Sequence, residues 1–180
     1  DQLDNLNVKF DLQILSDIKE HIEWLYDQSI AEAEWDKLKT YKDANWYTTK
    51  ESVLPNSNNF IHKLTKSITD KKCVVVDGGG TALYAGFQSA VMHKNDRIIC
   101  SSAISSMGTG LAETIGVSKS GEFSKYICVI GDGSLMMNIQ DLQTIRQDNI
   151  NVIICVINNN GYLAIRHTQN EFLEGRLYGT

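Results

Sequence analysis

Apolar and polar positions follow one another in blocks along residues 125–166. One apolar run, Tyr126–Ile130, ends at Gly131-Asp132-Gly133, and a second, Val152–Ile157, ends at Asn158-Asn159-Asn160-Gly161. Between these runs, apolar residues recur at steps of three and four, which predicts a helix over 134–147 with Ser134 as its cap. Strand, helix and strand in this order form a βαβ unit with parallel strands. We therefore expect both polar turns at one rim of a sheet.

The same alternation continues upstream. The expected helices span 58–68, 81–93 and 108–117, and the expected strands span 73–76 and 97–100. We predict an α/β domain over residues 57–180, built as a parallel sheet with helices on both faces. Residues 1–56 are expected to lie outside it, with one helix from Ser16 to about 28, a second over 30–41, and a linker over 42–56 that contains the only proline, Pro55.

The polar turns carry groups suited to a metal and an anion. Asp132 supplies a carboxylate, Asn159 an amide oxygen, and a nearby main-chain carbonyl a third hard oxygen of the kind that Mg²⁺ prefers. Glycines beside Asp132 allow close approach of a bulky anion, which the N-terminus of the following helix favours. A further glycine run, Asp77-Gly78-Gly79-Gly80-Thr81, follows the strand at 73–76. It lacks the GxGxxG spacing typical of nicotinamide-dinucleotide sites.

Composition excludes several classes of function. The net charge is −5 and Lys and Arg are scattered, which argues against a nucleic-acid groove. No apolar run approaches the length of a membrane-spanning helix. The four cysteines, at 73, 100, 128 and 155, each lie in or at the end of an apolar run and form no CxxC motif. We interpret them as small buried residues of a cytoplasmic protein rather than disulfide or metal ligands.

The run GDGSLMMNIQDLQTI, followed by INVIICVINNNGYLAIRHTQ, resembles the thiamine diphosphate (ThDP) signature of the acetolactate synthase large-subunit family. The resemblance implies that 57–180 is the diphosphate- and Mg²⁺-binding domain of the ThDP fold, short of the family's last strands. It implies that 1–56 is the tail of the central domain, which binds FAD in many relatives. We therefore expect ThDP and Mg²⁺ as cofactors, with FAD possible in the full-length protein.

The resemblance also implies a role for each residue of the site. Mg²⁺ is expected to bind the side chains of Asp132 and Asn159 and the carbonyl of Gly161, with Asn160 in place of Asn159 if the register slips by one. Met107 would hold the cofactor in its bent form, and the carbonyl of Ser105 would accept a hydrogen bond from the aminopyrimidine. The expected cofactor-binding residues are Gly79, Gly80, Thr81, Ser105, Met107, Gly131, Asp132, Gly133, Ser134, Asn159, Gly161, Tyr162 and Leu163.

The implied reaction removes CO₂ from a 2-oxo acid and joins the remaining acyl unit to an acceptor carbonyl, as a transferase or lyase. The family's catalytic glutamate belongs to a pyrimidine-binding domain of the same or a partner subunit, so we expect a homodimer or homotetramer and an inactive isolated chain. The expected helices at 108–117 and 134–147 would pack in the dimer.

The chain departs from the family pattern at several positions. Where relatives have DVGQHQ it has DGGGTA, and Thr168 replaces the tryptophan of VRQWQ. Loss of that tryptophan predicts a larger, more polar acceptor, such as a keto-sugar. Two alternatives remain: a non-catalytic module that binds phosphate or nucleotides at the same rim, and a fragment whose function is to dock to a partner half.

Overall fold

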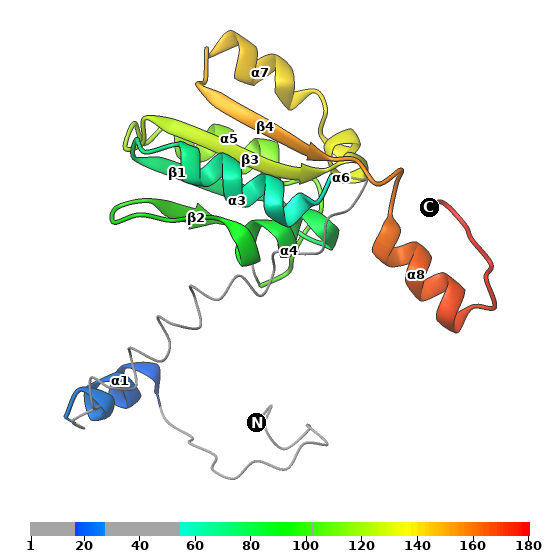
Figure 1. Cartoon of the computed structure of the whole chain (residues 1–180), viewed down its shortest axis with the longest axis horizontal. Helices are drawn as coiled ribbons and strands as arrows, with labels where there is room; N and C mark the ends of the chain where they lie inside the picture. The colour runs from blue at the N-terminus through cyan, green and yellow to red at the C-terminus, as the bar shows by residue number, and fades with distance from the viewer. Residues whose placement is uncertain (1–16, 28–54, 102) are drawn as a thin grey trace. The chain divides into compact units, whose positions relative to one another are not determined.

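The computed structural model describes residues 17–27, 55–101 and 103–180 (Figure 1). The chain divides into two compact units, Asp1–Asn45 and Trp46–Thr180. In the first unit the described element is helix α1, Ile18–Asp27, which agrees with the helix expected from Ser16. The helix predicted at 30–41 and most of the predicted linker lie outside the described residues.

The second unit is built on four strands. They are β1 (Lys72–Val76), β2 (Arg97–Ile99), β3 (Lys125–Gly131) and β4 (Val152–Ile157). All pairings are parallel and the strand order is β2-β1-β3-β4, which confirms the predicted fold class. From β1 the chain moves outward to β2 and then returns to the other side of β1 to form β3. The order therefore reverses between β1 and β3, and such a switch point is where open α/β sheets bind ligands.

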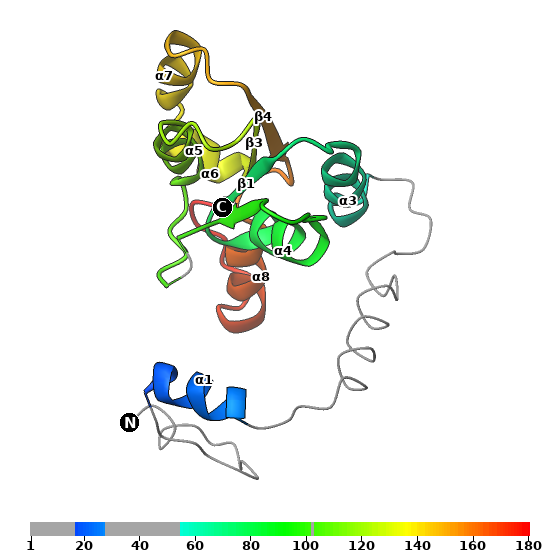
Figure 2. The ribbon, with the colours of Figure 1, turned by 90° about the vertical axis from the view of Figure 1, so that its left-hand side faces the viewer.

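Helices cover both faces of this sheet (Figure 2). Helices α3 (Ser57–Ser67) and α4 (Gly80–Ser89) pack on one face, and α5 (Gly110–Ser118) and α7 (Asp141–Gln147) on the other. Successive residues of a strand point to opposite faces, so Val74 packs with α3 and α4, whereas Cys128 packs with α5 and α7. Because both faces are covered, β1 is buried at all five positions and reads as a continuous apolar run after Lys72.

The single helix predicted over 134–147 is wrong. The chain forms two short helices, α6 (Asp132–Met137) and α7, separated by a turn at Asn138, whose φ of −134° and ψ of 37° are not helical. Ser134 is not the cap: it lies inside α6, 6% exposed, and Gly131 occupies the capping position. The helix is too short for its dipole to dominate anion binding at this rim.

The helix predicted over 81–93 ends at Ser89. Ala90 turns to extended backbone, and the amide of Val91 donates to the hydroxyl of Thr65 at 2.9 Å instead of continuing the helix. His93, expected on this helix, lies beyond it. The bond between Val91 and Thr65 joins residues that are distant in the sequence, so helical periodicity alone could not reveal where this helix ends.

A buried ion pair closes the other end of the sheet, at the amino end of β1. Lys72 Nζ lies 2.6 Å from Asp96 Oδ2, with the two side chains 0% and 2% exposed. Burial opposes ionisation of Asp96, but hydrogen bonds from Lys72 and His93 and the charge of Lys72 hold its pKa below the usual value. Nζ also donates to the carbonyl of Ile68 at 3.1 Å and lies 2.9 Å from His93 Nδ1. The buried ammonium is thus paired and hydrogen-bonded, as a charge in this position requires.

The chain after β4 forms α8 (Leu163–Phe172), which buries none of its residues in this chain. Within the described ranges, no helix has the length and apolar composition that crossing a bilayer demands.

Two loops meet at the carboxyl end of β1. A Cβ added to Gly78 would lie 2.3 Å from the carbonyl carbon of Ser105 and 2.3 Å from the carbonyl oxygen of Ser106. Asp77, which is fully buried, accepts a hydrogen bond from the amide of Gly110 at 2.9 Å. The segment 105–110 is therefore fixed against the turn that follows β1.

We predict that the thiols react in two classes. All four cysteines are free, and burial raises the pKa of Cys73 to about 11, of Cys155 to about 11 and of Cys128 to about 12. Burial also raises the pKa of Cys100, but this thiol is only partly buried and is therefore more accessible to a reagent. Because the thiolate is the reactive form, raising its pKa lowers reactivity at pH 8. With a disulfide reagent at pH 8, Cys100 should react first and the other three at least roughly tenfold more slowly. Equal rates for all four thiols in the folded chain would contradict the described burial.

We also predict that Gly78→Ala destabilises the domain. The added methyl group would collide with backbone atoms, so the free energy of unfolding should fall by roughly 2–3 kcal/mol. Gly116→Ala in α5 is the matched control, since a Cβ there meets nothing within 4 Å, and alanine should raise helix stability by about 0.5–1 kcal/mol. Urea unfolding followed by circular dichroism measures both changes. Equal effects of the two substitutions would exclude the close approach at Gly78.

Candidate functional site

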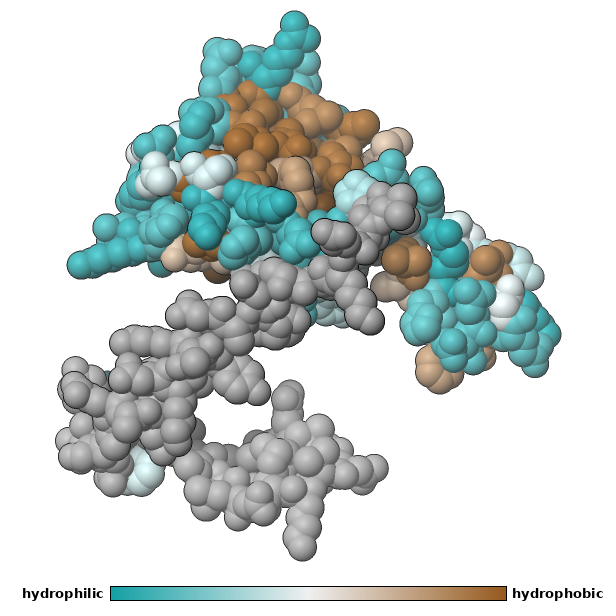
Figure 3. Space-filling view, viewed as in Figure 1, coloured by the Kyte–Doolittle hydropathy of each residue, from teal (hydrophilic) through white to brown (hydrophobic). Residues whose placement is uncertain are grey.

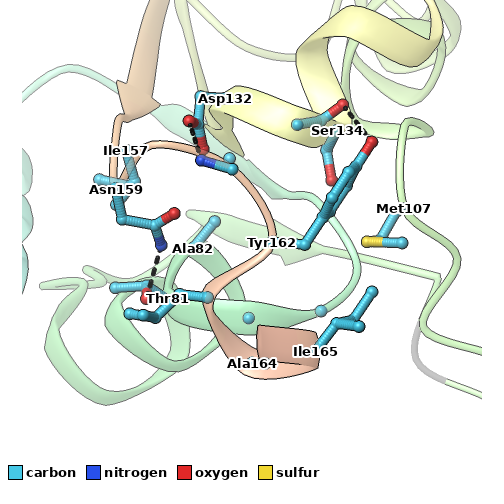
Figure 4. Close-up of a pocket in the computed structure, with 16 residues that line it drawn as sticks. Thr81, Ala82, Met107, Asp132, Ser134, Ile157, Asn159, Tyr162, Ala164 and Ile165 are labelled. Atoms are coloured by element: carbon cyan, nitrogen blue, oxygen red, sulfur yellow. Dashed lines mark hydrogen bonds between the residues drawn. The ribbon is translucent and has the colours of Figure 1, made fainter. Parts of the chain in front are cut away.

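A pocket opens where the carboxyl ends of β1, β3 and β4 meet (Figure 4). Every residue expected to bind the cofactor lines it, except Ser105. Four further residues line it that the sequence analysis missed: Ala82, Ile157, Ala164 and Ile165. These are apolar residues outside any motif. The signal that would have found them was their position beside the polar turns, at the start of α4, the end of β4 and the start of α8.

A hydrogen bond joins the turns after β3 and β4. Asp132 is the first residue of α6, and its Oδ2 accepts from the amide of Gly161 at 2.7 Å. Gly161 has a φ of +114°, which favours glycine, so the turn that presents this amide depends on that residue. The bond holds the carboxylate at the pocket and fixes the start of the segment that leads into α8.

A second contact between the same turns requires a glycine. A Cβ at Gly133 would lie 2.5 Å from Cε1 of Tyr162, so the aromatic ring rests directly on the Gly133 backbone. The Tyr162 hydroxyl donates a long hydrogen bond, 3.5 Å, to the Gly133 carbonyl. The ring thereby forms one wall of the pocket beside Ser134 (Figure 4).

Asn159 presents an amide oxygen that lacks a hydrogen-bond partner. Its Nδ2 lies 3.4 Å from Thr81 Oγ1, to which it donates, whereas Oδ1 is buried and accepts no hydrogen bond in the described chain. A buried polar atom left in this way is costly unless a ligand satisfies it. Asn160 differs: it is exposed, does not line the pocket, and its carbonyl accepts from Arg166 Nη2 at 2.6 Å. The geometry therefore favours Asn159 over Asn160 as the residue that faces a ligand.

The pocket contains little charge of its own. Of the residues that line it, Asp132 alone carries a charged side chain, and the described part of the chain holds no cluster of three or more His, Cys, Asp or Glu placed to bind a metal. One carboxylate and one amide oxygen make an incomplete shell for a hard cation. A cation here would need further oxygens from its ligand, and a ligand rich in anionic oxygens would need the cation.

Met107 faces the pocket from the segment between β2 and α5. It is 38% exposed, and its Cγ would lie 3.4 Å from a Cβ built on Gly79. Ser105 has a φ of +52° and donates its amide to the Ser101 carbonyl at 2.6 Å, but it does not line the pocket. The role expected for its carbonyl stays a prediction.

Thr168 also lies outside the pocket lining. It is exposed on α8, and its hydroxyl donates to the Ala164 carbonyl of its own helix at 3.1 Å. The larger, more polar acceptor inferred from this residue stays a prediction.

A larger hollow lies elsewhere and carries no comparable chemistry. It holds about 470 Å³ along the outer edge of β4 beside Phe60, against about 60 Å³ for the pocket at the strand ends. Figure 3 shows apolar residues gathered over β4. None of the residues that line this hollow is a carboxylate or a basic side chain. The smaller pocket, where a carboxylate and an unsatisfied amide oxygen converge, is the better candidate for a ligand site.

Comparison with known proteins agrees with this geometry. The thiamine pyrophosphate enzyme, C-terminal TPP binding domain family matches residues 77–180, a range that includes the whole pocket. Acetolactate synthase large subunit of Buchnera aphidicola subsp. Schlechtendalia chinensis is 33% identical over 150 residues, which cover 79% of this chain and 25% of that protein. The same subunit of Buchnera aphidicola subsp. Acyrthosiphon pisum is 32% identical over 156 residues, 82% of this chain and 26% of that protein.

Acetolactate synthase isozyme 2 large subunit of Escherichia coli is 29% identical over 116 residues, which cover 63% of this chain and 21% of that protein. The chain thus spans about a quarter of the length of the curated relatives that it matches. The family match covers more than half of the chain and includes both polar turns of the pocket. The chain therefore belongs to the thiamine pyrophosphate enzymes and carries their C-terminal TPP-binding domain.

Proposed function

We propose that this chain supplies the Mg²⁺- and diphosphate-binding half of the active site of a ThDP-dependent enzyme that acts on a 2-oxo acid and forms a carbon–carbon bond. The observation that carries the proposal is the buried, unsatisfied Oδ1 of Asn159, which shares one pocket with the carboxylate of Asp132. Similarity to acetolactate synthase large subunits supports the reaction class, a transferase or lyase.

Three residues fit the Mg²⁺ ion. Asp132 provides the negative charge, and the Gly161 amide fixes its carboxylate from the turn after β4. Asn159 provides a neutral oxygen to which no donor of the described residues bonds. The Gly161 carbonyl accepts from the Leu163 amide at 3.2 Å, but a carbonyl oxygen has two lone pairs and retains one for a metal. Diphosphate oxygens and water would complete the six ligands.

The diphosphate would lie against backbone amides. Gly79 and Gly80, with φ values of +87° and +60°, cap and begin α4, and both line the pocket with Thr81. The free amides at the start of this helix would bind the diphosphate. Gly133 and Ser134 border the opposite side of the pocket. Since the pocket has no basic side chain, Mg²⁺ and these amides must together balance the anion.

The remaining residues would contact the ring end of the cofactor. When bound, ThDP supplies the electron sink for breaking the bond beside the carboxylate of a 2-oxo acid. Met107 would support the bent form of the cofactor between its two rings, and the Ser105 carbonyl would accept from the aminopyrimidine. Tyr162 and Leu163 would cover the cofactor from the side of α8.

The open pocket favours a second domain as partner. Sites for ligands of cofactor size usually enclose about 300–1,000 Å³, whereas this pocket holds about 60 Å³. Apolar side chains that line it stand exposed, including Leu163 at 47% and Ile165 at 41%. We propose that a pyrimidine-binding domain, of the same or a partner subunit in a homodimer or homotetramer, covers this surface and supplies the missing catalytic carboxylate. FAD stays a possibility for a longer protein.

We predict that the chain binds ThDP weakly and only with Mg²⁺. Calorimetric titration of ThDP should give heat with Mg²⁺ present and none with a chelator. Asp132→Ala removes the only charged metal ligand and should weaken binding at least roughly 100-fold, a loss of about 2.7 kcal/mol. Asp141→Asn is the matched control because it removes a carboxylate from the start of α7, outside the pocket, and should change affinity less than about twofold.

The same titration with a nucleoside diphosphate tests the competing class of function. A phosphate-binding module would accept the nucleotide as well as ThDP and would depend less on Mg²⁺. Equal affinities for the two ligands would favour that module. If ThDP binds neither this chain nor a longer protein that contains it, the proposal is contradicted.

A further inference from the structure

The segment that carries Met107 is held at both ends by residues that the proposed mechanism does not use. At one end the backbone of Gly78 touches Ser105 and Ser106, and at the other end Asp77 Oδ1 accepts from the Gly110 amide at 2.9 Å. Asp77 is fully buried directly after β1, which is one of the two inner strands of the sheet. Both ends of the segment are therefore tied to the turn that follows a rigid strand.

Between these two ends the segment meets the break between α6 and α7. Asn138 Nδ2 donates to the Gly108 carbonyl at 2.7 Å. Gly108 is buried with a φ of +84°, and a Cβ there would lie 2.9 Å from Cβ of Met137 and 3.3 Å from Asn138 Nδ2. The backbone of Gly108 thus packs directly on the two residues at which α6 ends.

A neighbouring bond fixes the orientation of the Asn138 amide. Gln140 Nε2 donates to Asn138 Oδ1 at 3.1 Å, which leaves Nδ2 as the donor toward Gly108. Both bonds require the nonhelical backbone of Asn138, whose carbonyl also accepts from the Asp141 amide at 3.0 Å. The break between α6 and α7 therefore places the Asn138 side-chain amide against the segment that carries Met107.

We infer that Asn138 is a positioning residue for the ring end of the cofactor, acting through Gly108 on the adjacent Met107. Neither Asn138 nor its partners Gly108 and Gln140 line the pocket, whereas Met107 does. Its removal should loosen Met107 without disturbing the metal or the diphosphate. The effect of Asn138 on ThDP binding rests on the proposed function, whereas its effect on the segment 105–110 does not.

The first measurement is hydrogen exchange of the segment 104–110 in the chain without ligand. Asn138→Asp keeps the size of the side chain but replaces the donor by a carboxylate oxygen that repels the Gly108 carbonyl. Exchange in this segment should rise roughly tenfold, the effect of losing one buried hydrogen bond. Peptides from β1 and β3 should exchange as in the unchanged chain. Asn138→Leu, which lacks any donor, is a second variant if Asn138→Asp fails to fold.

Gln143→Ala is the matched control, because it removes an exposed side chain from α7 and leaves both bonds of the Asn138 amide intact. It should change exchange of the segment less than about twofold. An unchanged exchange rate in the Asn138 variants, or an equal rise in Gln143→Ala, would overturn the inference.

The second measurement compares two ligands in the presence of Mg²⁺. Asn138→Asp should weaken binding of ThDP at least roughly fivefold while leaving the affinity for inorganic pyrophosphate within about twofold, since Met107 serves only the ring end. An equal loss for both ligands would assign Asn138 a general structural role and overturn the inference. Failure of the unchanged chain to bind either ligand would count against the proposed function, and the exchange measurement would still decide whether Asn138 holds the segment.

Discussion

The parallel pairing of β3 with β1 on one side and β4 on the other determines where chemistry is possible in this domain. The register pairs Gly131 with Ile157 and Val76 with Val129, so β3 and β4 end level and β1 ends two residues earlier. The turns that follow these strands must then open at one rim, while the covered sides of the sheet hold apolar residues. The buried pair of Lys72 and Asp96 lies at the amino end of β1, away from the pocket, where it anchors the sheet without altering the charge of the site.

Glycines allow the turns at this rim to pack closely enough to form a site. At two places a side chain would not fit between neighbouring turns, at Gly78 against Ser105 and at Gly133 against Tyr162. The polar groups that remain are few and are held by bonds between turns, as Asp132 is by Gly161. Such a site has rigid walls and little charge. It suits a ligand that brings its own anionic oxygens together with a cation.

The sequence predicted the sheet because the pattern of apolar runs is local. The family resemblance supplied the expected site residues, which line the pocket except for Ser105, and their roles stay predictions. The apolar run predicted at 152–157 coincides with β4. The polar groups of the turns after β3 and β4 line the pocket, as the sequence predicted. The helix interruption was missed because Leu135, Leu142 and Ile145 kept helical spacing across it. The pattern placed Ile139 on the same buried face, yet Ile139 is 43% exposed. Asn138 leaves the helix for a partner thirty residues away, and no local pattern records such a bond.

The two sides of the pocket differ in how far their side chains are exposed to solvent. Walls that would hold the metal and diphosphate come from strand ends and buried turns: Ser134 is 6% exposed and Asn159 Oδ1 is buried. Side chains on the other side, Met107, Leu163 and Ile165, are 38%, 47% and 41% exposed. Apolar groups that border a pocket and remain this open are typical of surfaces that another protein part covers. The side of the pocket that would bind charge is therefore already closed in this domain, whereas the side that would enclose the reacting rings is open, and the proposed second domain would cover it.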